Sequence, residues 1–175
     1  QDRQHAYPSS TGGEQAKFTA YAHTVQDEQH VIVKFSPPGT DAVAQRWRDL
    51  LRCEYHALRV LHDHAADTGA QAARAQVLDA DRVYLEVQRF DRIGVRGRRG
   101  VVSLGALDDV FVGQRQNWVQ TAQQLQRMRM LTEREVERIS LLYAFGLLIH
   151  NTDMHFGNLA LWHDGPASKQ FTLAP

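Results

Sequence analysis

The sequence has a single cysteine, Cys53, and no excess of charge of either sign. One cysteine excludes an internal disulfide framework and a cysteine-based zinc site, which is typical of proteins from a reducing cytosol. We expect Cys53 to be a small buried hydrophobe. Twenty basic residues balance twenty acidic ones, so no net field attracts nucleic acid or an anionic membrane. We therefore predict no direct nucleic-acid binding and no membrane binding.

Long apolar runs are also missing from the 175 residues. No segment approaches the about 20 residues that span a bilayer, and the first ten residues lack the apolar core of a signal peptide. We therefore expect a cytoplasmic protein. The sequence has no initiator Met, and its last residues, FTLAP, read as a strand leading onward. We expect the chain to be a fragment of a longer protein.

The amino-terminal half has the pattern of a β-rich region with one long helix. Aromatic and β-branched residues predict strands over residues 17–24 and 30–35, and a second strand pair over 76–78 and 83–90. Apolar residues recur at helical spacing over about 41–66. Then DRIGVRGRRG holds three glycines and four arginines, which predicts a flexible, solvated connection between two lobes.

The carboxy-terminal half alternates helical patterns with a polar loop and a hairpin. We predict short helices over 104–111 and 117–128, and a longer helix over 133–149 that begins with the capping pair Thr132 and Glu135. A hairpin turning at Asp164 and Gly165 follows. The sequence thus predicts an α+β fold with two lobes: residues 1–92 form a β-rich lobe with one long helix, and residues 93–175 carry the polar loop.

A lysine and a glutamate in the first lobe are candidates for a nucleotide site. Lys34 closes the apolar strand VIVK, where its ammonium suits phosphates. Glu54 shares a helix face with Leu51 and Leu58, where a carboxylate needs a partner. Lys34 is a reasonable partner, and such a pair positions ATP in protein kinases. A Glu54 at the solvated margin of the helix is the alternative.

Two further segments have features of a nucleotide site. SSTGGEQAK places Gly12 and Gly13 before a strand, where backbone amides approach a phosphate and Lys17 supplies charge, although the segment is not a Walker A loop and ordinary turns share this pattern. In EVQRFDR, backbone groups at the strand end suit an adenine edge. Asp91 there either reaches a ribose hydroxyl or pairs with a neighbouring arginine, Arg89 or Arg92.

The segment LLIHNTDMHFGNLAL crowds polar residues between two apolar stretches. Asp153 and Asn158 have the D-x-x-x-x-N spacing of a kinase catalytic loop, in which the aspartate accepts the substrate's proton and the asparagine binds magnesium. The usual H-R-D triplet is absent, and NTD stands in its place. The spacing alone is weak, but a glycine loop, lysine, glutamate and this pair follow one another in kinase order.

The sequence also allows two other readings. His150, Asp153, His155 and His163 are metal-binding types that suit a zinc or iron hydrolase. Alternatively, the protein is a pseudokinase or binding module without catalysis, whose arginine cluster grips nucleic acid: Arg92, Arg96, Arg98 and Arg99.

Several of these segments together resemble one known family. SSTGGEQAKF, VIVKF, EYHALRVL, VQRFDR and NTDMHFGNLAL resemble the HipA family, the serine/threonine kinase toxins of bacterial toxin–antitoxin systems, and GGEQAKF is most similar to its HipT and YjjJ-like branch. The resemblance extends over nearly the whole chain. It implies an atypical protein-kinase fold whose helical lobe is truncated here, with ATP and Mg²⁺ as cofactors.

The resemblance also implies roles for individual residues. Asp153 would be the catalytic base, Asn158 a magnesium ligand, and Lys34 an ATP-phosphate contact partnered by Glu54. Ser10, with Ser9 beside it, would match the autophosphorylation position. The other nucleotide-binding residues would be Gly12, Gly13, Glu14, Gln15, Ala16 and Lys17 on the phosphate-side loop, Gln88, Arg89, Phe90 and Asp91 at the hinge, and His155.

Members of that family phosphorylate aminoacyl-tRNA synthetases, and many are neutralised by a DNA-binding antitoxin, so the resemblance implies both kinds of partner. It also implies a second metal-binding acid after the strand that contains FTLAP. Asp164 does not replace it, because we expect Asp164 in a hairpin turn that faces away from the site. We therefore expect this stretch of chain alone to be catalytically inactive or nearly so.

Overall fold

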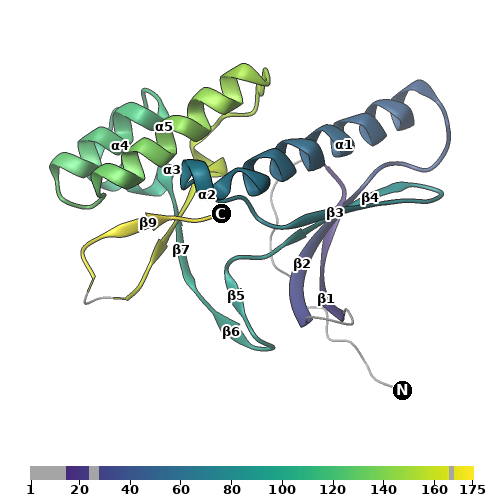
Figure 1. Cartoon of the computed structure of the whole chain (residues 1–175), viewed down its shortest axis with the longest axis horizontal. Coiled ribbons are helices and arrows are strands. Elements are labelled where there is room, and N and C mark those ends of the chain that lie inside the picture. Colours follow the sequence, from purple (N-terminus) through teal and green to yellow (C-terminus); the bar gives the residue numbers. More distant parts are fainter. Residues whose placement is uncertain (1–14, 24–27, 166–167) are drawn as a thin grey trace. The chain divides into compact units, whose positions relative to one another are not determined.

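The computed structural model of the chain describes residues 15–23, 28–165 and 168–175. These residues form two compact units (Figure 1). Unit 1 comprises the chain up to His62 together with Ala73–Gly97, and unit 2 comprises Asp63–Ala72 and Arg98–Pro175. The chain therefore enters unit 2 briefly after its long helix, returns to unit 1, and then completes unit 2.

Unit 1 is an antiparallel sheet with one long helix. Its strands are β1 (Lys17–His23), β2 (Glu28–Phe35), β3 (Ala75–Asp79) and β4 (Val83–Gln88), in the order β1-β2-β4-β3. Helix α1 (Ala42–Asp63) packs on this sheet through a small core of Leu51, Val83 and Leu85. The predicted strands and helix are confirmed. Apolar residues at alternating positions of the strands and at helical spacing in α1 place one face of each element against this core.

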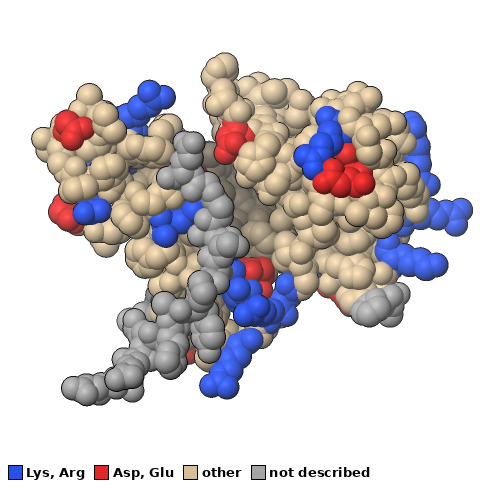
Figure 2. Space-filling view, turned by 180° about the vertical axis from the view of Figure 1, so that it is seen from behind, with Lys and Arg blue, Asp and Glu red and all other residues tan. Residues whose placement is uncertain are grey.

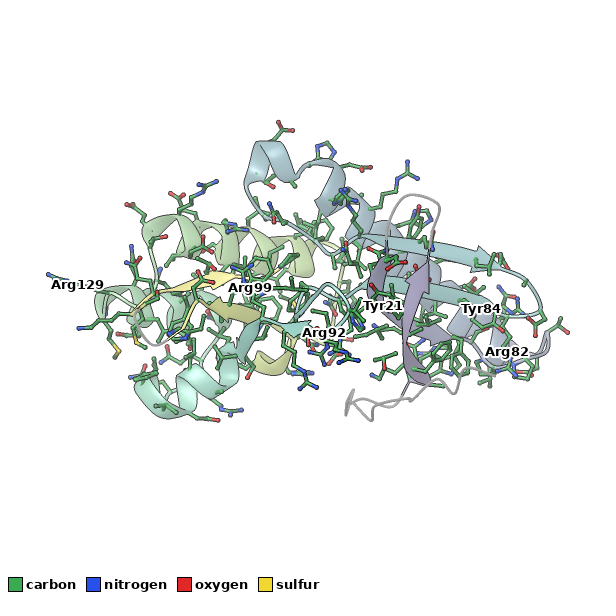
Figure 3. The ribbon with its side chains drawn as sticks, turned by 90° about the horizontal axis from the view of Figure 1, so that it is seen from below. Tyr21, Arg82, Tyr84, Arg92, Arg99 and Arg129 are labelled. Atoms are coloured by element: carbon green, nitrogen blue, oxygen red, sulfur yellow. The ribbon has the colours of Figure 1, made fainter. Side chains whose placement is uncertain are left out.

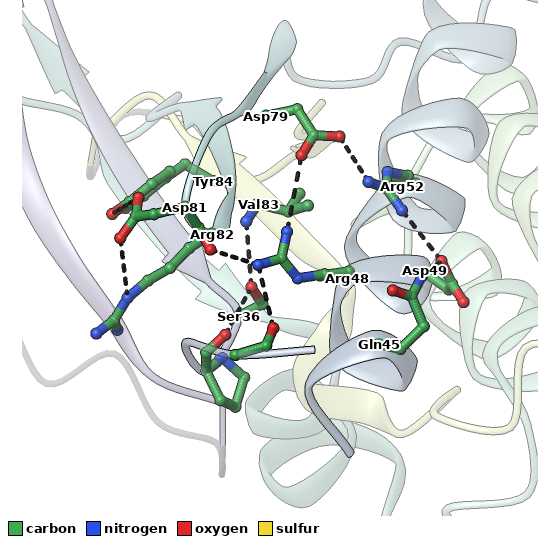
Figure 4. Close-up of polar contacts among 12 residues, drawn as sticks. Ser36, Gln45, Arg48, Asp49, Arg52, Asp79, Asp81, Arg82, Val83 and Tyr84 are labelled. Atoms are coloured by element: carbon green, nitrogen blue, oxygen red, sulfur yellow. Dashed lines mark hydrogen bonds and ion pairs between the residues drawn. The ribbon is translucent and has the colours of Figure 1, made fainter. Parts of the chain in front are cut away.

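Charged side chains also tie α1 to the turn between β3 and β4 (Figure 4). Arg52 donates to Asp79 at 2.5 Å and to Asp49 on its own helix at 3.1 Å. Arg48, only 12% exposed, reaches Asp79 at 3.8 Å and donates to the backbone carbonyl of Asp81. The helix is thus fastened by a network of ion pairs beside a small apolar core.

Unit 2 has a larger core. It begins with α2 (Ala65–Thr68), and its elements after the return of the chain are β7 (Gly100–Ser103), α3 (Leu104–Leu107), the π-helix η1 (Asp108–Val112), α4 (Trp118–Arg127), α5 (Glu133–Leu148), the 3₁₀ turn η2 (Phe156–Asn158), β8 (Ala160–His163) and β9 (Phe171–Leu173). The strands form an antiparallel sheet in the order β7-β8-β9. Residues from β8, β9, α3, α4 and α5 share one apolar cluster, which includes Leu104, Leu125, Ile139, Leu161 and Leu173. The predicted carboxy-terminal helices and hairpin are confirmed.

Two predictions about local structure are wrong. The Arg/Gly segment is not simply a flexible connection, because it forms a two-stranded pair, β5 (Arg92–Ile93) with β6 (Gly97–Arg98), and leads directly into β7. Cys53 is exposed. It lies on the opposite side of α1 from the buried Leu51, because neighbours two apart on a helix point in nearly opposite directions.

Within the part of the chain that the structure describes, no helix combines the length and apolar character needed to cross a bilayer. On the face drawn in Figure 2, basic and acidic side chains lie in small groups among other residues.

Candidate functional site

The structure brings Lys34 and Glu54 together in unit 1. The Lys34 ammonium donates to Glu54 Oε1 at 2.5 Å, and the two side chains are 26% and 35% exposed. Lys34 lies opposite Leu85 in the β2–β4 register, so its side chain is on the sheet face that α1 covers. Glu54 follows Leu51 by about one turn on that helix. The pair is therefore a fixed cation with one side still open to solvent.

Lys17 is the next charged group on this face. The β1–β2 register places Lys17 directly opposite Lys34, and residues opposite each other in an antiparallel pair share a face. Ala16, beside it, accepts a hydrogen bond from the Phe35 amide at 3.2 Å. Two lysines thus lie on adjacent strands, and Glu54 compensates the charge of one of them. Gln15 is the first described residue; the other loop candidates lie outside the described residues: Ser9, Ser10, Gly12, Gly13 and Glu14.

The hinge candidates Gln88 and Arg89 do not have the free backbone amides that the sequence suggested. The Gln88 N–H donates to the Arg74 carbonyl at 2.8 Å, and the Arg89 N–H donates to the His30 carbonyl at 2.8 Å. The reason is the strand order: β4 lies between β2 and β3, so both of its edges are paired to the end of the strand. Phe90 follows at the turn after β4 and is partly buried.

Asp91 pairs with arginines rather than extending as a free ribose ligand. Arg89 donates to both of its carboxylate oxygens, at 2.8 and 2.7 Å, and Arg92 donates to Oδ2 at 2.8 Å. The hydrogen bonds from Arg89, with the nearby positive charges, hold the pKa of Asp91 below its ordinary value. Of the two sequence readings of Asp91, the structure supports the pairing.

The loop after α5 holds Asp153 by its backbone and leaves its carboxylate in solvent. Helix α5 ends at Leu148, His150 just beyond it has φ of 56°, and Asn151 then accepts the Asp153 N–H at 2.9 Å through its side chain. Asn158 Nδ2 donates to the Asp153 carbonyl at 2.6 Å. The Asp153 side chain is 79% exposed, with His155 Nε2 at 3.7 Å from it. Both peptide groups of Asp153 are thus fixed, while its carboxylate is exposed beside His155.

Asn158 fits the role of a magnesium ligand as far as its chemistry goes. Because its Nδ2 is used as a donor to Asp153, the side-chain oxygen of this exposed residue is left as an acceptor, and hard oxygen atoms are what Mg²⁺ prefers. His155 Nδ1 accepts the Gly157 N–H at 3.0 Å, which caps the 3₁₀ turn that carries Asn158. Asn158 is therefore the residue here that would hold a magnesium ion.

The alternative metal site of His150, Asp153, His155 and His163 is not supported. Among the described residues, no three His, Cys, Asp or Glu side chains are grouped so that they could hold a metal ion. His163 Nε2 instead lies 2.9 Å from the Ser168 carbonyl, and its ring packs against Phe171.

The arginine cluster is engaged within the protein. Arg92 pairs with Asp91 at 2.8 Å, while Arg99 pairs with Asp164 at 3.0 Å and stacks over Trp162 at 3.6 Å. Figure 3 labels Arg92 and Arg99. Two of the four arginines therefore neutralise local carboxylates, and the binding-module reading gains no support from them.

The sequence reasoning missed two buried carboxylates in unit 2. Glu135 was expected only as a helix cap, but its side chain accepts the Leu173 N–H at 2.7 Å and pairs with Arg138 at 2.9 Å, so it fastens β9 to α5. Asp108 is fully buried and accepts bonds from Thr121 at 2.7 Å and from the Arg115 N–H at 3.0 Å. Leu173 is 38 positions from Glu135 and Thr121 is 13 positions from Asp108, so no local signal marks these two contacts.

Comparisons with known proteins agree with this architecture. The family model described as HipA-like C-terminal domain matches residues 9–175. Toxin YjjJ of Escherichia coli K12 is 41% identical over 169 residues, which is 95% of this chain and 37% of that protein. The chain thus spans well under half the length of this curated relative.

Two solved structures are similar. The proinflammatory kinase CtkA of Helicobacter pylori matches with a TM-score of 0.65 at 15% identity, over 96% of this chain and 54% of that chain. HipA of Shewanella oneidensis, solved with HipB and operator DNA, matches with a TM-score of 0.57 at 16% identity, over 99% of this chain and 46% of that chain. The predicted α+β, kinase-like fold is confirmed by these likenesses.

Proposed function

The chain belongs to the family of the HipA-like C-terminal domain, and on that premise we propose that it carries the ATP-binding and catalytic residues of a serine/threonine protein kinase of a bacterial toxin–antitoxin system. The observation that carries the proposal is the Lys34–Glu54 pair at 2.5 Å. A strand lysine held by a helix glutamate is the arrangement with which kinases hold ATP phosphates. The opposed Lys17 and the solvent-facing Asp153 support the same function.

In the proposed reaction, bound Mg–ATP supplies the phosphoryl group and the positive charge that neutralises its oxygens. Lys34 binds the phosphates, while Glu54 holds the ammonium in place. Asp153 takes the proton of a serine or threonine hydroxyl as that oxygen bonds to the γ-phosphorus and the bond to the oxygen of the departing ADP breaks. Asn158 would hold the metal through its side-chain oxygen.

The remaining roles are part of the same proposal. The segment of Gly12, Gly13, Glu14, Gln15, Ala16 and Lys17 would cover the phosphates, and Ser10 or Ser9 would be the self-phosphorylated residue. Adenine would be held by Gln88, Arg89 and Phe90 through groups other than the two amides that the sheet already uses. His155 would lie beside the nucleotide.

We extend the proposal to partners. The substrate would be a translation-related protein such as an aminoacyl-tRNA synthetase, met in the cytoplasm. Because the similar Shewanella HipA was solved with HipB and operator DNA, a DNA-binding antitoxin is the proposed inhibitor.

Calorimetric titration of the chain with Mg²⁺ and a non-hydrolysable ATP analogue tests the nucleotide site. Lys34→Met should weaken binding by about 10-fold or more, since a charge-assisted contact to phosphate is lost. Lys169→Met, at an exposed lysine in unit 2, removes the same charge elsewhere and should change affinity less than about 2-fold. Equal affinity of the Lys34→Met variant and the unsubstituted chain would overturn the proposed nucleotide site.

Phosphoryl transfer from radiolabelled ATP tests the role of Asp153. In the protein as its host makes it, Asp153→Asn should bind the analogue normally and lose about 100-fold or more in transfer rate, because the amide cannot accept the proton. Undiminished transfer would reject Asp153 as the base. Magnesium-dependent turnover by the 175-residue chain itself would contradict the separate prediction that this stretch alone is inactive.

A further inference from the structure

The loop that carries Asp153 and Asn158 is anchored to the core of unit 2 by apolar side chains. These alternate along the loop with the exposed polar side chains. Asp153 and His155 are exposed, whereas Met154 and Phe156 turn inward and pack against the apolar cluster of unit 2. An extended segment alternates sides in this way, so the functional groups face out because their neighbours face in. What Met154 and Phe156 rest on therefore sets where Asp153 lies.

Each inward side chain rests on a buried glycine. Met154 lies over Gly146 of α5, and Phe156 lies over Gly105 of α3. A Cβ on Gly146 would lie 2.7 Å from Sδ and Cε of Met154, which are the flexible end of that side chain. Met154 can relieve this crowding by turning its tip, so the loop backbone need not move.

The contact at Gly105 is of a different kind. A Cβ there would lie 3.3 Å from the Cβ of Phe156 and 3.7 Å from its carbonyl carbon and oxygen. No side-chain rotation moves these atoms, because they belong to the main chain or are bonded directly to it. Next to it, the Leu104 N–H donates to the Leu159 carbonyl at 2.9 Å, which fixes α3 to the end of the same loop.

We propose that Gly105 is a positioning residue for the proposed catalytic loop: α3 is the platform that sets the backbone of Phe156, and through it the places of Asp153 and Asn158. The naming of the loop as catalytic rests on the proposed function, but the positioning itself does not. A methyl group at residue 105 pushes the 3₁₀ turn that begins at Phe156 and ends at Asn158. The hydrogen bond from Asn158 Nδ2 to the Asp153 carbonyl, 2.6 Å long, is the bond that such a shift disturbs.

The side-chain amide of Asn158 gives a direct signal of that shift by nuclear magnetic resonance, without nucleotide. In Gly105→Ala its resonance should move and its hydrogen exchange should rise about 10-fold, because the bond to Asp153 is a local one that opens without unfolding. Gly146→Ala is the matched control: the same change at another buried glycine under the same loop. There only the Met154 methyl resonance should move.

Two results would overturn the inference directly: an Asn158 signal that does not move in Gly105→Ala, and an Asn158 signal that moves equally in Gly146→Ala. If Gly105→Ala does not fold, Phe156→Ala decides, because it keeps the Cβ that rests on Gly105 and removes the ring. An unmoved Asn158 signal in Phe156→Ala then supports the platform, and a moved signal assigns the positioning to the ring instead.

Activity of the protein as its host makes it provides a second readout. Gly105→Ala should lower kcat about 10-fold with KM for ATP unchanged, since small misplacements of a catalytic group cost rate rather than nucleotide affinity. An unchanged kcat together with a moved Asn158 signal would separate the loop from catalysis and count against the proposed function alone. An Asn158 amide signal that does not change in Gly105→Ala would reject the positioning role of Gly105 and leave the proposed function untouched.

Discussion

The two units hold their functional side chains by different means. In unit 1, Lys34 and Glu54 neutralise each other at 2.5 Å beside a small core, and the charges of Arg52 and Asp79 fasten α1. In unit 2, the Asp153 loop is held by bonds to its own backbone and by apolar anchors, and Asp153 keeps a carboxylate that is 79% exposed. Under the proposed function, Lys34 would bind phosphate as a charge fixed in advance, whereas Asp153 would accept a proton through an exposed carboxylate.

The largest expected effect is in unit 2, at the ion pair of Glu135 and Arg138. This pair is an exception to the contrast, because it fastens unit 2 by charge. Glu135→Ala removes the partner of Arg138 and of the Leu173 N–H. We expect a loss of about 4 kcal/mol in the free energy of unfolding, because a buried charge and a buried amide are left unsatisfied. Chemical denaturation measures it. Glu137→Ala, at an exposed position of the same helix, should change the midpoint little, and equal losses in both variants would refute the role of Glu135.

The apolar core of unit 2 should come next. Leu125 is fully buried in α4, so Leu125→Ala should cost about 3 kcal/mol through lost burial and the cavity left behind. The loss should be the same in low and high salt, since no charge is involved. Leu148→Ala, at a side chain that is 85% exposed, serves as the control. A loss at Leu125 that changed strongly with salt would break the contrast between the units.

A smaller and salt-dependent effect is expected in unit 1. Asp79→Asn weakens the bond from Arg52 at 2.5 Å and the longer contact with Arg48. Because Asp79 is 50% exposed, we expect a loss of about 1 kcal/mol at low salt that shrinks in 1 M salt. A double-mutant cycle with Arg52→Gln isolates the pair. A coupling energy that survives high salt unchanged would show that the network acts through packing instead.

The smallest effect concerns pH. Arg89 lowers the pKa of Asp91 below its ordinary 3.8, so the ionised form is favoured in the folded state. Its contribution is therefore present above the unfolded pKa and is lost as pH falls through the lower folded value. Asp91 is 25% exposed, so we expect about 0.5 kcal/mol after screening.

Denaturation midpoints of the unsubstituted chain and of Asp91→Asn, measured from pH 7 down to strongly acidic pH, should differ at neutral pH and converge in acid. A difference that persists unchanged to the lowest pH would contradict the assignment.

Much of the fold was readable because its signals are local. The strand β2 and the helix α1 follow from apolar spacing within each segment. The contact between Lys34 and Glu54 was also readable, since a carboxylate on an apolar helix face requires a nearby cation. These inferences needed only the chemistry of one segment and its neighbour.

What the sequence did not reveal depends on partners far along the chain. The amide of Gln88 is used because β3 adds to the outer edge of β4, and no pattern within β4 states that order. Glu135 bonds to Leu173, 38 positions away. The Arg/Gly segment pairs with itself as β5 and β6 although its composition is that of a loop. Long-range pairing therefore decided the first two cases, whereas β5 and β6 are a short local pairing that the composition of the segment did not indicate.

The register of β1 and β2 has a thermodynamic consequence. Lys17 and Lys34 lie opposite each other across the two strands, and the Glu54 carboxylate, 2.5 Å from the Lys34 ammonium, compensates one of the two charges. Under the proposed function, a nucleotide phosphate bound beside these lysines would stabilise the folded state by RT ln(1 + [L]/Kd), which is about 2.7 kcal/mol at a hundredfold excess over Kd. Unit 1 would then be a scaffold whose melting temperature rises with the concentration of the phosphate-bearing molecule that it binds.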